Sequence, residues 1–287
     1  MSNKFKLLLS CIFMLNIVLP VFSFSPSGGV LVLDGEDDYA ILPFGKYGYI
    51  IPRDTDAFTV EFWFYPTSDN QPEAGKSNII LSQQVRFALG TKNRCIDPVN
   101  ETDELCIFGA AYLEGAANGI SGVHVVIKKN EWNYMAVIFT DSTLYLAYND
   151  KIYKKRKFTP MNVVAGELRL PEGFKNFCVG GYAEDFLIPK LYFQGEIDTI
   201  RVSNIARYDL PIEKGISAFE PPHRFSSDAN TLALWNFDEH EGSETFEDAS
   251  GNGYTLTGMN GATTSGTLAV QPTSNSLSTT WAKIKSE

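Results

Sequence analysis

The chain has 287 residues, of which 44% are hydrophobic and 20% are charged, a mixture typical of globular proteins. Its formal net charge of -10 leaves no excess of basic residues to neutralise phosphates, so nucleic acid and anionic membranes are excluded as expected partners. This length suits one large β domain or two ordinary domains.

The first 23 residues have the pattern of a secretory signal peptide. Lys4 and Lys6 precede the apolar run LLLSCIFMLNIVLPVF, and small residues follow it. Asn16, Pro20 and the short length of the run argue against the alternative, a membrane anchor. We therefore expect cleavage after Ser23, a secreted or cell-surface protein, and no membrane span in the mature chain.

Two cysteines are candidates for a local disulfide. Cys95 and Cys106 flank a polar, turn-rich stretch, and an oxidising compartment favours their pairing. The alternative is a pair of reduced surface thiols. Cys178 lies in the apolar pattern FCVGG, which predicts a buried thiol outside any disulfide.

Short apolar or alternating runs recur along the chain between Gly, Pro, Asn and Asp residues, and almost none has a helical pattern. The clearest, AFTVEFWFYP, places Val60, Phe62 and Phe64 on one face of a strand and Glu61, Trp63 and Tyr65 on the other. In chain order the runs are VLVLDG, YAILP, AFTVEFWFYP, NIILSQ, VRFALG, LCIFGAAYL, GVHVVIK, WNYMAVIFT, TLYLAYND, KIYKKRKF, GELRLP, NFCVGGY, EIDTIRVS, TLALWNF, ETFED and YTLTG. About a dozen closely spaced strands predict an all-β fold, an antiparallel β-sandwich or jelly roll.

The pattern of strands places one domain at residues 28–262, with a long connection at 208–227. Residues 263–287 are rich in Ser and Thr and poor in large apolar residues, which predicts a linker and a short C-terminal tail. The final LSTTWAKIKSE is compatible with a short docking helix or with a disordered end.

Five blocks of the sequence carry a resemblance to a known family. They are VLVLDGEDDYAILP, FTVEFWFYP, EWNYMAVIFTDSTLYLAYND, FCVGGYAEDF with FQGEIDTIRVSNIARY, and TLALWNFDEHEGSETFEDASGNGYTL. In this order they resemble the laminin G-like, concanavalin A-like jelly-roll domains of the pentraxin-like superfamily. The resemblance implies two antiparallel sheets, but the fold hosts lectins, adhesins, structural modules and glycosidases.

The stretch GEIDTIR bears on whether the protein is a glycosidase. Glu196 and Asp198 resemble the start of the catalytic strand of laminarinase-type enzymes, but Ile200 and Arg201 stand where a second Glu is required. Retaining glycosidases need two carboxyl groups about 5–5.5 Å apart. We therefore predict no catalytic residues and no enzymatic activity, and expect Asp198 and Arg201 to hold a turn or strand edge by hydrogen bonds.

The stretch FEDASGNGY, residues 246–254, is a candidate calcium loop. The resemblance implies a cation near the beginning of the first strand, where Asp34, Asp37 and Asp38 offer further oxygens. We predict Ca²⁺ ligands at Asp34, Asp38, Asp248 and Asn252. The alternative is a turn in which Asp248 bonds its own backbone.

Exposed aromatic rings are the expected contacts for a sugar. The tyrosines near turns are the candidates for ligand binding, whereas the strand tryptophans are expected in the core. These sets are Tyr47, Tyr49, Tyr112 and Tyr182, and Trp63, Trp132 and Trp235. We predict calcium-assisted binding of an extracellular polysaccharide or glycoprotein. The alternatives are a structural or protein–protein adhesion module without a sugar pocket, and a glycoside hydrolase of the same fold.

Overall fold

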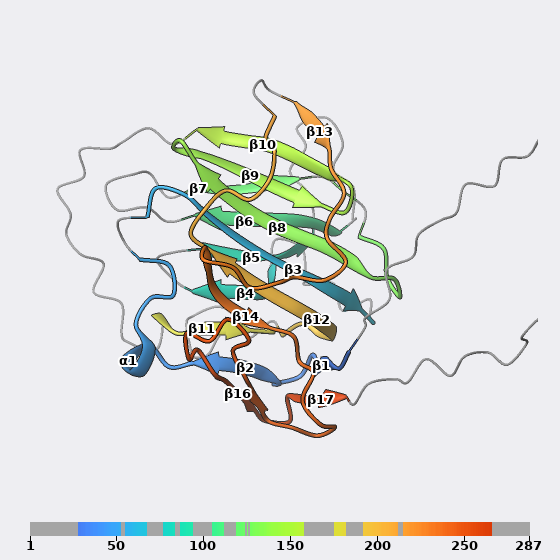
Figure 1. Ribbon diagram of the computed structural model, residues 1–287. Helices are drawn as coiled ribbons and strands as arrows, with labels where there is room; N and C mark the ends of the chain where they lie inside the picture. The colour runs from blue at the N-terminus through green and yellow to red at the C-terminus, as the bar shows by residue number, and fades with distance from the viewer. Residues whose placement is uncertain are drawn as a thin grey trace, which may run out of the picture.

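The alternating runs of the sequence form two antiparallel β-sheets that stack face to face (Figure 1). One short helix, α1 (Phe44–Tyr47), lies at a corner of the sandwich. The computed structural model describes residues 28–52, 55–67, 77–83, 87–93, 105–111, 119–123, 125, 127–157, 175–181, 192–211 and 215–265.

The larger sheet, called sheet A, has nine strands. Eight follow the order β13-β10-β9-β8-β3-β12-β1-β17, and β14 pairs with β12. The strands are β1 (Val30–Asp34), β3 (Phe58–Pro66), β8 (Asn133–Thr140), β9 (Thr143–Tyr148), β10 (Lys151–Lys157), β12 (Gln194–Ser203), β13 (Ile216–Ala218), β14 (Thr231–Trp235) and β17 (Thr263–Ser265). Because β1 pairs with β17, the two ends of the described chain meet in this sheet.

The smaller sheet, called sheet B, has eight strands in the order β15-β16-β2-β11-β4-β5-β6-β7. They are β2 (Tyr39–Leu42), β4 (Ser77–Gln83), β5 (Phe87–Asn93), β6 (Leu105–Ala111), β7 (Gly119–Val123), β11 (Phe177–Val179), β15 (Thr245–Phe246) and β16 (Leu256–Met259). The predicted antiparallel sandwich of two sheets is confirmed, with 17 strands among the described residues.

The main core lies between the sheets. The predicted alternation of β3 is confirmed, because Val60, Phe62 and Phe64 all join this core with no exposed surface. Phe177 of sheet B packs on Trp235 of sheet A with their ring centroids 5.1 Å apart. Burying so many large side chains supplies the main driving force for folding, at roughly 25 cal/mol per Å² of apolar surface.

A second core covers the other face of sheet A. Residues 204–211 and 215–230, which we call the crossing segment, run over this face and carry β13 (orange in Figure 1). Phe225 and Phe219 of the segment pack on Tyr134 of β8, and the indole of Trp63 donates a 3.0 Å hydrogen bond to the carbonyl of Pro222. The segment therefore fills the surface that would otherwise be an open sheet face.

A buried ion pair anchors the crossing segment to sheet A. Glu61 of β3 and Arg201 of β12 are directly paired strand neighbours, and Arg201 Nη2 lies 2.8 Å from Glu61 Oε1. Tyr134 and Tyr208 both donate their hydroxyl hydrogens to Glu61 Oε2. Arg201 also donates to the carbonyl of Ser226, at 3.2 Å. Every strong polar group of this buried cluster therefore has a partner, as a low-dielectric site requires.

Two short strands lie where the sequence indicated none. β13 forms inside the predicted connection 208–227, and β17 forms inside the predicted linker 263–287, so the domain extends at least to Ser265. Each has three residues, too few to show an alternating pattern. Both are stabilised by a partner strand that is distant in sequence, β10 for β13 and β1 for β17.

The tryptophans fall partly as expected. Trp63 and Trp235 are buried, whereas Trp132 precedes β8, is half-buried and packs on the ring of Tyr65 at 5.5 Å. Cys178 is buried in β11, as predicted. Among the described residues, no helix is long and apolar enough to cross a membrane. The predicted signal peptide, residues 1–23, lies outside the described residues.

Replacing Glu61 by Gln should lower the free energy of unfolding by about 3–5 kcal/mol, because the guanidinium of Arg201 would then be buried without a counter-charge. Chemical denaturation monitored by tryptophan fluorescence measures this loss. The matched control is Glu131→Gln, which removes the exposed pair with Lys128 and should cost less than about 1 kcal/mol. Equal losses in the two variants would contradict the anchoring role.

Candidate functional site

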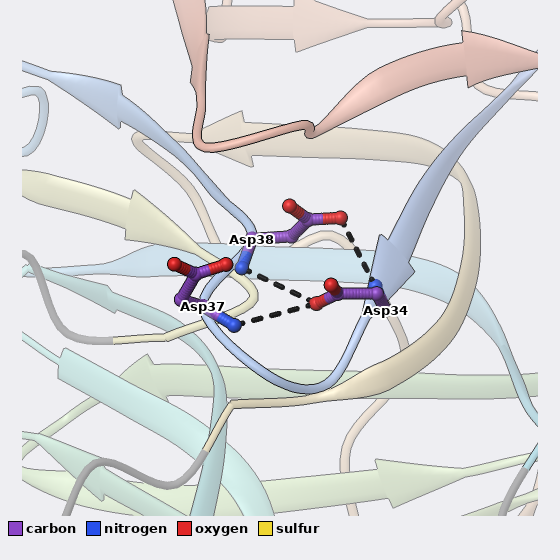
Figure 2. Close-up of side chains that lie close together, drawn as sticks. All are labelled: Asp34, Asp37 and Asp38. Carbon is purple, nitrogen blue, oxygen red and sulfur yellow. Dashed lines mark hydrogen bonds between the residues drawn. The ribbon is translucent and has the colours of Figure 1, made fainter.

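The turn between β1 and β2 gathers three carboxylates, as Figure 2 shows. Asp34 Oδ1 accepts backbone hydrogen bonds from Glu36 at 2.7 Å, Asp37 at 3.3 Å and Asp38 at 3.4 Å. Gly35, with φ of 78°, lets the chain fold tightly enough for this. One carboxylate oxygen from each of Asp34, Asp37 and Asp38 lies within 4.8 Å of the others. We call this group the aspartate turn.

Asp38 is the buried member of the aspartate turn, with 6% of its surface exposed. Its Oδ2 accepts a 3.2 Å hydrogen bond from the backbone of Asp34, but its buried Oδ1 has no hydrogen-bond partner among the described residues. Burial raises the pKa of Asp38, the Asp34 amide lowers it, and the neighbouring carboxylates raise it further. A divalent cation would satisfy Oδ1 and offset the repulsion, and carboxylate oxygens are the ligands that calcium prefers.

The turn between β16 and β17, which is close to the C-terminal end of the described chain, packs against the aspartate turn. The side-chain amide of Asn260 donates a 2.9 Å hydrogen bond to the carbonyl of Asp37. Gly261 lies against Asp38, so close that a Cβ there would stand 2.8 Å from Asp38 Oδ1. The aspartate turn therefore lies where the β1–β2 and β16–β17 connections meet.

The other predicted calcium ligands have structural roles. Asp248 Oδ1 accepts hydrogen bonds from the backbone of Leu234 at 3.0 Å and Ser250 at 2.9 Å, while Oδ2 accepts one from Tyr254 at 3.1 Å. The amide of Asn252 donates to the carbonyls of Thr231 and Leu232. This is the turn that the sequence left open as the alternative to a calcium loop.

The four predicted metal ligands do not form one site. Asp34 pairs with Gln194 on β12, whereas Leu234, which binds Asp248, pairs with Arg201 on the same strand. Seven residue steps along β12, at roughly 3.3 Å each, therefore separate Asp34 from Leu234 by about 23 Å. The structure therefore keeps Asp34 and Asp38 together, adds Asp37, and places Asp248 and Asn252 elsewhere.

Two of the predicted tyrosines lie together at the corner formed by α1. Phe44 packs edge-on against Tyr49 with ring centroids 4.8 Å apart, and Tyr47 lies 6.0 Å from Tyr254. All four residues are partly exposed, although Tyr47 and Tyr254 also pack against the main core and the hydroxyl of Tyr49 is buried. The Nζ atom of Lys46 lies 4.6 Å from the centre of the Tyr47 ring. We call Phe44, Tyr47, Tyr49 and Tyr254 the tyrosine corner.

Buried polar contacts fix the shape of the tyrosine corner. The Phe44 amide donates a 2.7 Å hydrogen bond to Asn176 Oδ1, and the side-chain amide of Gln83 donates to the carbonyl of Gly48. Asp248 holds the amide of Tyr254, so the turn predicted to bind calcium instead positions an aromatic ring. The sequence analysis missed Tyr254, whose place depends on contacts between α1 and the loop after β15.

Several predicted residues cannot be placed in the site. Tyr112, Tyr182 and Cys95 lie outside the described residues. Cys106 lies on β6 opposite Lys92 of β5, and its pairing with Cys95 stays a prediction.

The stretch GEIDTIR forms most of β12 and contains a bulge. Ile197 pairs with Phe64 and Ile200 with Phe62, so three steps along β12 match two along β3. The bulge lets both Ile197 and Ile200 enter the main core and leaves Asp198 buried beside the crossing segment. Arg201 binds Glu61 rather than Asp198, and β12 is a central strand, so the two residues do not jointly hold a strand edge as predicted.

Asp198 is an unusual carboxylic acid. It is 7% exposed, and no hydrogen bond to its side chain is found among the described residues. Burial, the largest cause, and the charge of Asp238 raise its pKa to about 7, although Arg224 lowers it. Burial also raises the pKa of Glu196. The positions that follow Asp198 hold no carboxylate for catalysis: Ile200 is buried in the core, and Arg201 forms the ion pair with Glu61.

No protein-family model matches the sequence, and no curated protein matches it. Among solved structures, the chain is similar to a putative carbohydrate binding protein from Bacteroides ovatus, with a TM-score of 0.52 and 14% identity over 84% of this chain. The aligned part spans 60% of that protein's length. This likeness and the two antiparallel sheets confirm the predicted fold, an antiparallel β-sandwich of two sheets.

Two further solved structures are similar to the chain at lower TM-scores. A SAP-like pentraxin from Limulus polyphemus has a TM-score of 0.38 and 11% identity, and covers 68% of this chain and 93% of its own. Domains LG4-5 of the mouse laminin alpha1 chain have a TM-score of 0.37 and 14% identity, and cover 69% of this chain and 47% of their own.

The raised pKa of Asp198 predicts a pH-dependent stability. The folded state keeps a proton up to about pH 7 that the unfolded state loses near its ordinary value of 3.8. The free energy of unfolding should therefore fall as pH rises between these values, by at most about 1.4 kcal/mol per pH unit from this group, and level off above pH 7. Asp198→Asn should remove this slope, whereas the exposed control Asp141→Asn should keep it, as urea denaturation from pH 4 to 8 would measure. An unchanged slope in Asp198→Asn would contradict the assignment.

Proposed function

We propose that this protein is a secreted, non-enzymatic binding module that recognises an extracellular polysaccharide or glycoprotein through the tyrosine corner. The observation that carries this proposal is the group of four partly exposed rings at one fixed corner of a rigid sandwich. Aromatic rings offer flat apolar faces to sugar rings, and their phenol groups bond to hydroxyls. Gly48 adds open space beside the rings, because a Cβ there would meet no atom within 4 Å.

The proposal of a non-enzymatic role rests on β12. The strand carries two carboxylates, Glu196 and Asp198. The positions where a second catalytic Glu would stand are occupied by Ile200, which lies in the main core, and Arg201, which pairs with Glu61. The crossing segment also carries Arg224, whose charge acts on the buried Asp198. A retaining mechanism needs two carboxyl groups that flank a bound sugar.

We further propose that Ca²⁺ binds the aspartate turn and assists recognition by fixing the ends of the domain. Asp34, Asp37 and Asp38 would provide carboxylate oxygens. Among the described residues, Oδ1 of Asp38 is buried without a hydrogen-bond partner and would gain most from binding the cation. A cation there would tie the β1–β2 turn to the turn that carries Asn260 and Gly261. Its role would be structural, because the tyrosine corner is built from other residues.

Removing rings from the tyrosine corner should weaken glycan binding. The wild type should bind at least one glycan. For that glycan, the double variant Tyr47→Ala and Tyr254→Ala should raise the dissociation constant by about tenfold or more, because each stacked ring contributes of the order of 1 kcal/mol. A glycan array identifies the ligand, and calorimetry measures the affinity. Ile216→Ala, which removes an exposed apolar side chain at the other end of sheet A, is the control. A folded wild type that binds no glycan would favour a protein-contact module instead.

Calcium should raise the melting temperature of the wild type, because a ligand present at about 100 times its dissociation constant stabilises the folded state by about 2.7 kcal/mol. In Asp38→Asn this response should disappear. Asp248→Asn should instead lower the melting temperature equally in calcium and in chelator, since its carboxylate binds backbone amides. Calorimetric scans of the three proteins decide between the two aspartates. A calcium response lost in Asp248→Asn alone would place the ion at the other loop.

A further inference from the structure

Two lysines from distant parts of the chain lie over rings of the tyrosine corner. The Nζ atom of Lys46 lies 4.6 Å from the centre of the Tyr47 ring, and the Nζ atom of Lys175 lies 5.1 Å from the centre of the Phe44 ring. Lys46 belongs to α1, whereas Lys175 shortly precedes β11. Asn176, next to Lys175, accepts the hydrogen bond from the Phe44 amide, so the fold itself brings the second lysine to α1.

These two ammonium groups form no ion pair with any described residue. The described segments that build the corner, residues 43–52, 175–181 and 251–258, contain no acidic residue, and the two lysines are their only charged residues. Just before the third segment, Glu247 and Asp248 already accept hydrogen bonds from a hydroxyl group and from backbone amides. The corner is therefore a locally basic surface on a chain whose net charge is -10.

The aromatic rings compensate little of this positive charge. The attraction between a cation and a ring is weak where water has access, and Lys46 is exposed while Lys175 is half-buried. An ammonium group also has three N–H donors, for which a ring provides no lone pair. Hydrogen bonds between charged groups are stronger. An anionic oxygen that reaches the corner would therefore bind each ammonium group more strongly than the ring does.

Open space lies beside the rings on both sides of the corner. Gly48 follows Tyr47 and Gly253 precedes Tyr254, and a Cβ at either glycine would meet no atom within 4 Å. Both glycines have positive φ values, of 68° and 83°, which favour glycine and so keep side chains away from these positions. A sugar can therefore place its flat apolar face on a ring, and the groups at its edge then lie within reach of the lysines.

We propose that the ligand of the tyrosine corner is a polysaccharide of uronic acids, whose carboxylates pair with Lys46 and Lys175. This inference rests on the glycan recognition proposed above and names its ligand class. An ammonium group so close to a ring matches a charge carried directly by the stacked sugar, as in a uronic acid, rather than one at the end of a flexible branch. Two lysines over two rings also match a chain with one charge on each sugar.

Two other acidic ligands fit less well. A polysulfated chain carries several charges on each sugar, so two lysines would leave most of them unpaired and close to an acidic protein. An acidic peptide offers carboxylates on flexible side chains, but those side chains have no flat apolar ring to stack on the aromatic faces. A polyuronate satisfies both the rings and the lysines.

The experiment compares polymers that differ only in charge. Calorimetry measures binding of the full chain to polygalacturonate and alginate, each beside its neutral methyl ester, with dextran sulfate and polyglutamate in parallel. We expect one polyuronate to bind at least about tenfold more tightly than its ester. Its dissociation constant should rise by about five- to tenfold from about 50 to about 200 mM salt, because pairing with two lysines releases about two counterions.

The double variant Lys46→Gln with Lys175→Gln should weaken polyuronate binding by about tenfold and remove most of its salt dependence, but leave binding of the ester unchanged. The control Lys128→Gln with Lys151→Gln removes the same charge from the loop before β8 and from β10, which lies remote from α1 (Figure 1), and should bind like the wild type. Circular dichroism checks that both variants are folded.

The outcomes separate this inference from the proposed function. If the esters bind as tightly as the polyuronates, and the variant Tyr47→Ala with Tyr254→Ala binds both more weakly, the uronate proposal is wrong while glycan recognition at the corner stands. Equal binding by the two lysine variants, or tighter binding of dextran sulfate or polyglutamate, would also overturn the uronate proposal. If the folded wild type binds no glycan, glycan recognition itself is wrong.

Discussion

The ion pair between Glu61 and Arg201 is the constraint on which much of this sandwich depends. A buried charge pair of this kind persists only when its remaining hydrogen-bonding groups are also satisfied. Tyr134, Tyr208 and the carbonyl of Ser226 meet this requirement, and two of them belong to the crossing segment. The crossing segment is thereby tied to sheet A by polar geometry as well as by its apolar second core. The crossing segment consequently covers the β8, β9 and β3 part of the second face of sheet A, whereas Val32 on β1 stays exposed.

Strand β12 organises the candidate sites. It pairs with β3 on one side, and with β1 and β14 at its two ends on the other. This division separates the aspartate turn, which follows β1, from the Asp248 turn, which is bonded to β14. Two acidic motifs that look interchangeable in the sequence therefore do different work. The aspartate turn gathers carboxylates around the buried Oδ1 of Asp38. The Asp248 carboxylate instead accepts hydrogen bonds from backbone amides, including that of Tyr254, and so fixes the position of Tyr254.

Local patterns in the sequence predicted the fold, because strand periodicity and turn residues act over a few positions. The alternation of Val60, Phe62 and Phe64 is such a pattern, and it needs no knowledge of the partner strand. The candidate sites were predicted less well because they depend on register. Asp38 and Asp248 are both aspartates beside turns, and only pairing along β12 reveals that they lie apart. Tyr254 has no distinguishing neighbour in the sequence, and it joins Tyr47 only through tertiary contact.

The partner of Arg201 illustrates the same limit. A carboxylate two or three residues away, Asp198, was the natural local candidate, whereas Glu61 is 140 positions distant. The bulge at Asp198 and Thr199 decides the outcome, since it turns Ile200 into the core and lets Arg201 lie opposite Glu61. A bulge depends on the mismatch between two strands, so neither strand alone specifies it. What remains on β12 is a carboxylic acid held near neutral pKa by burial.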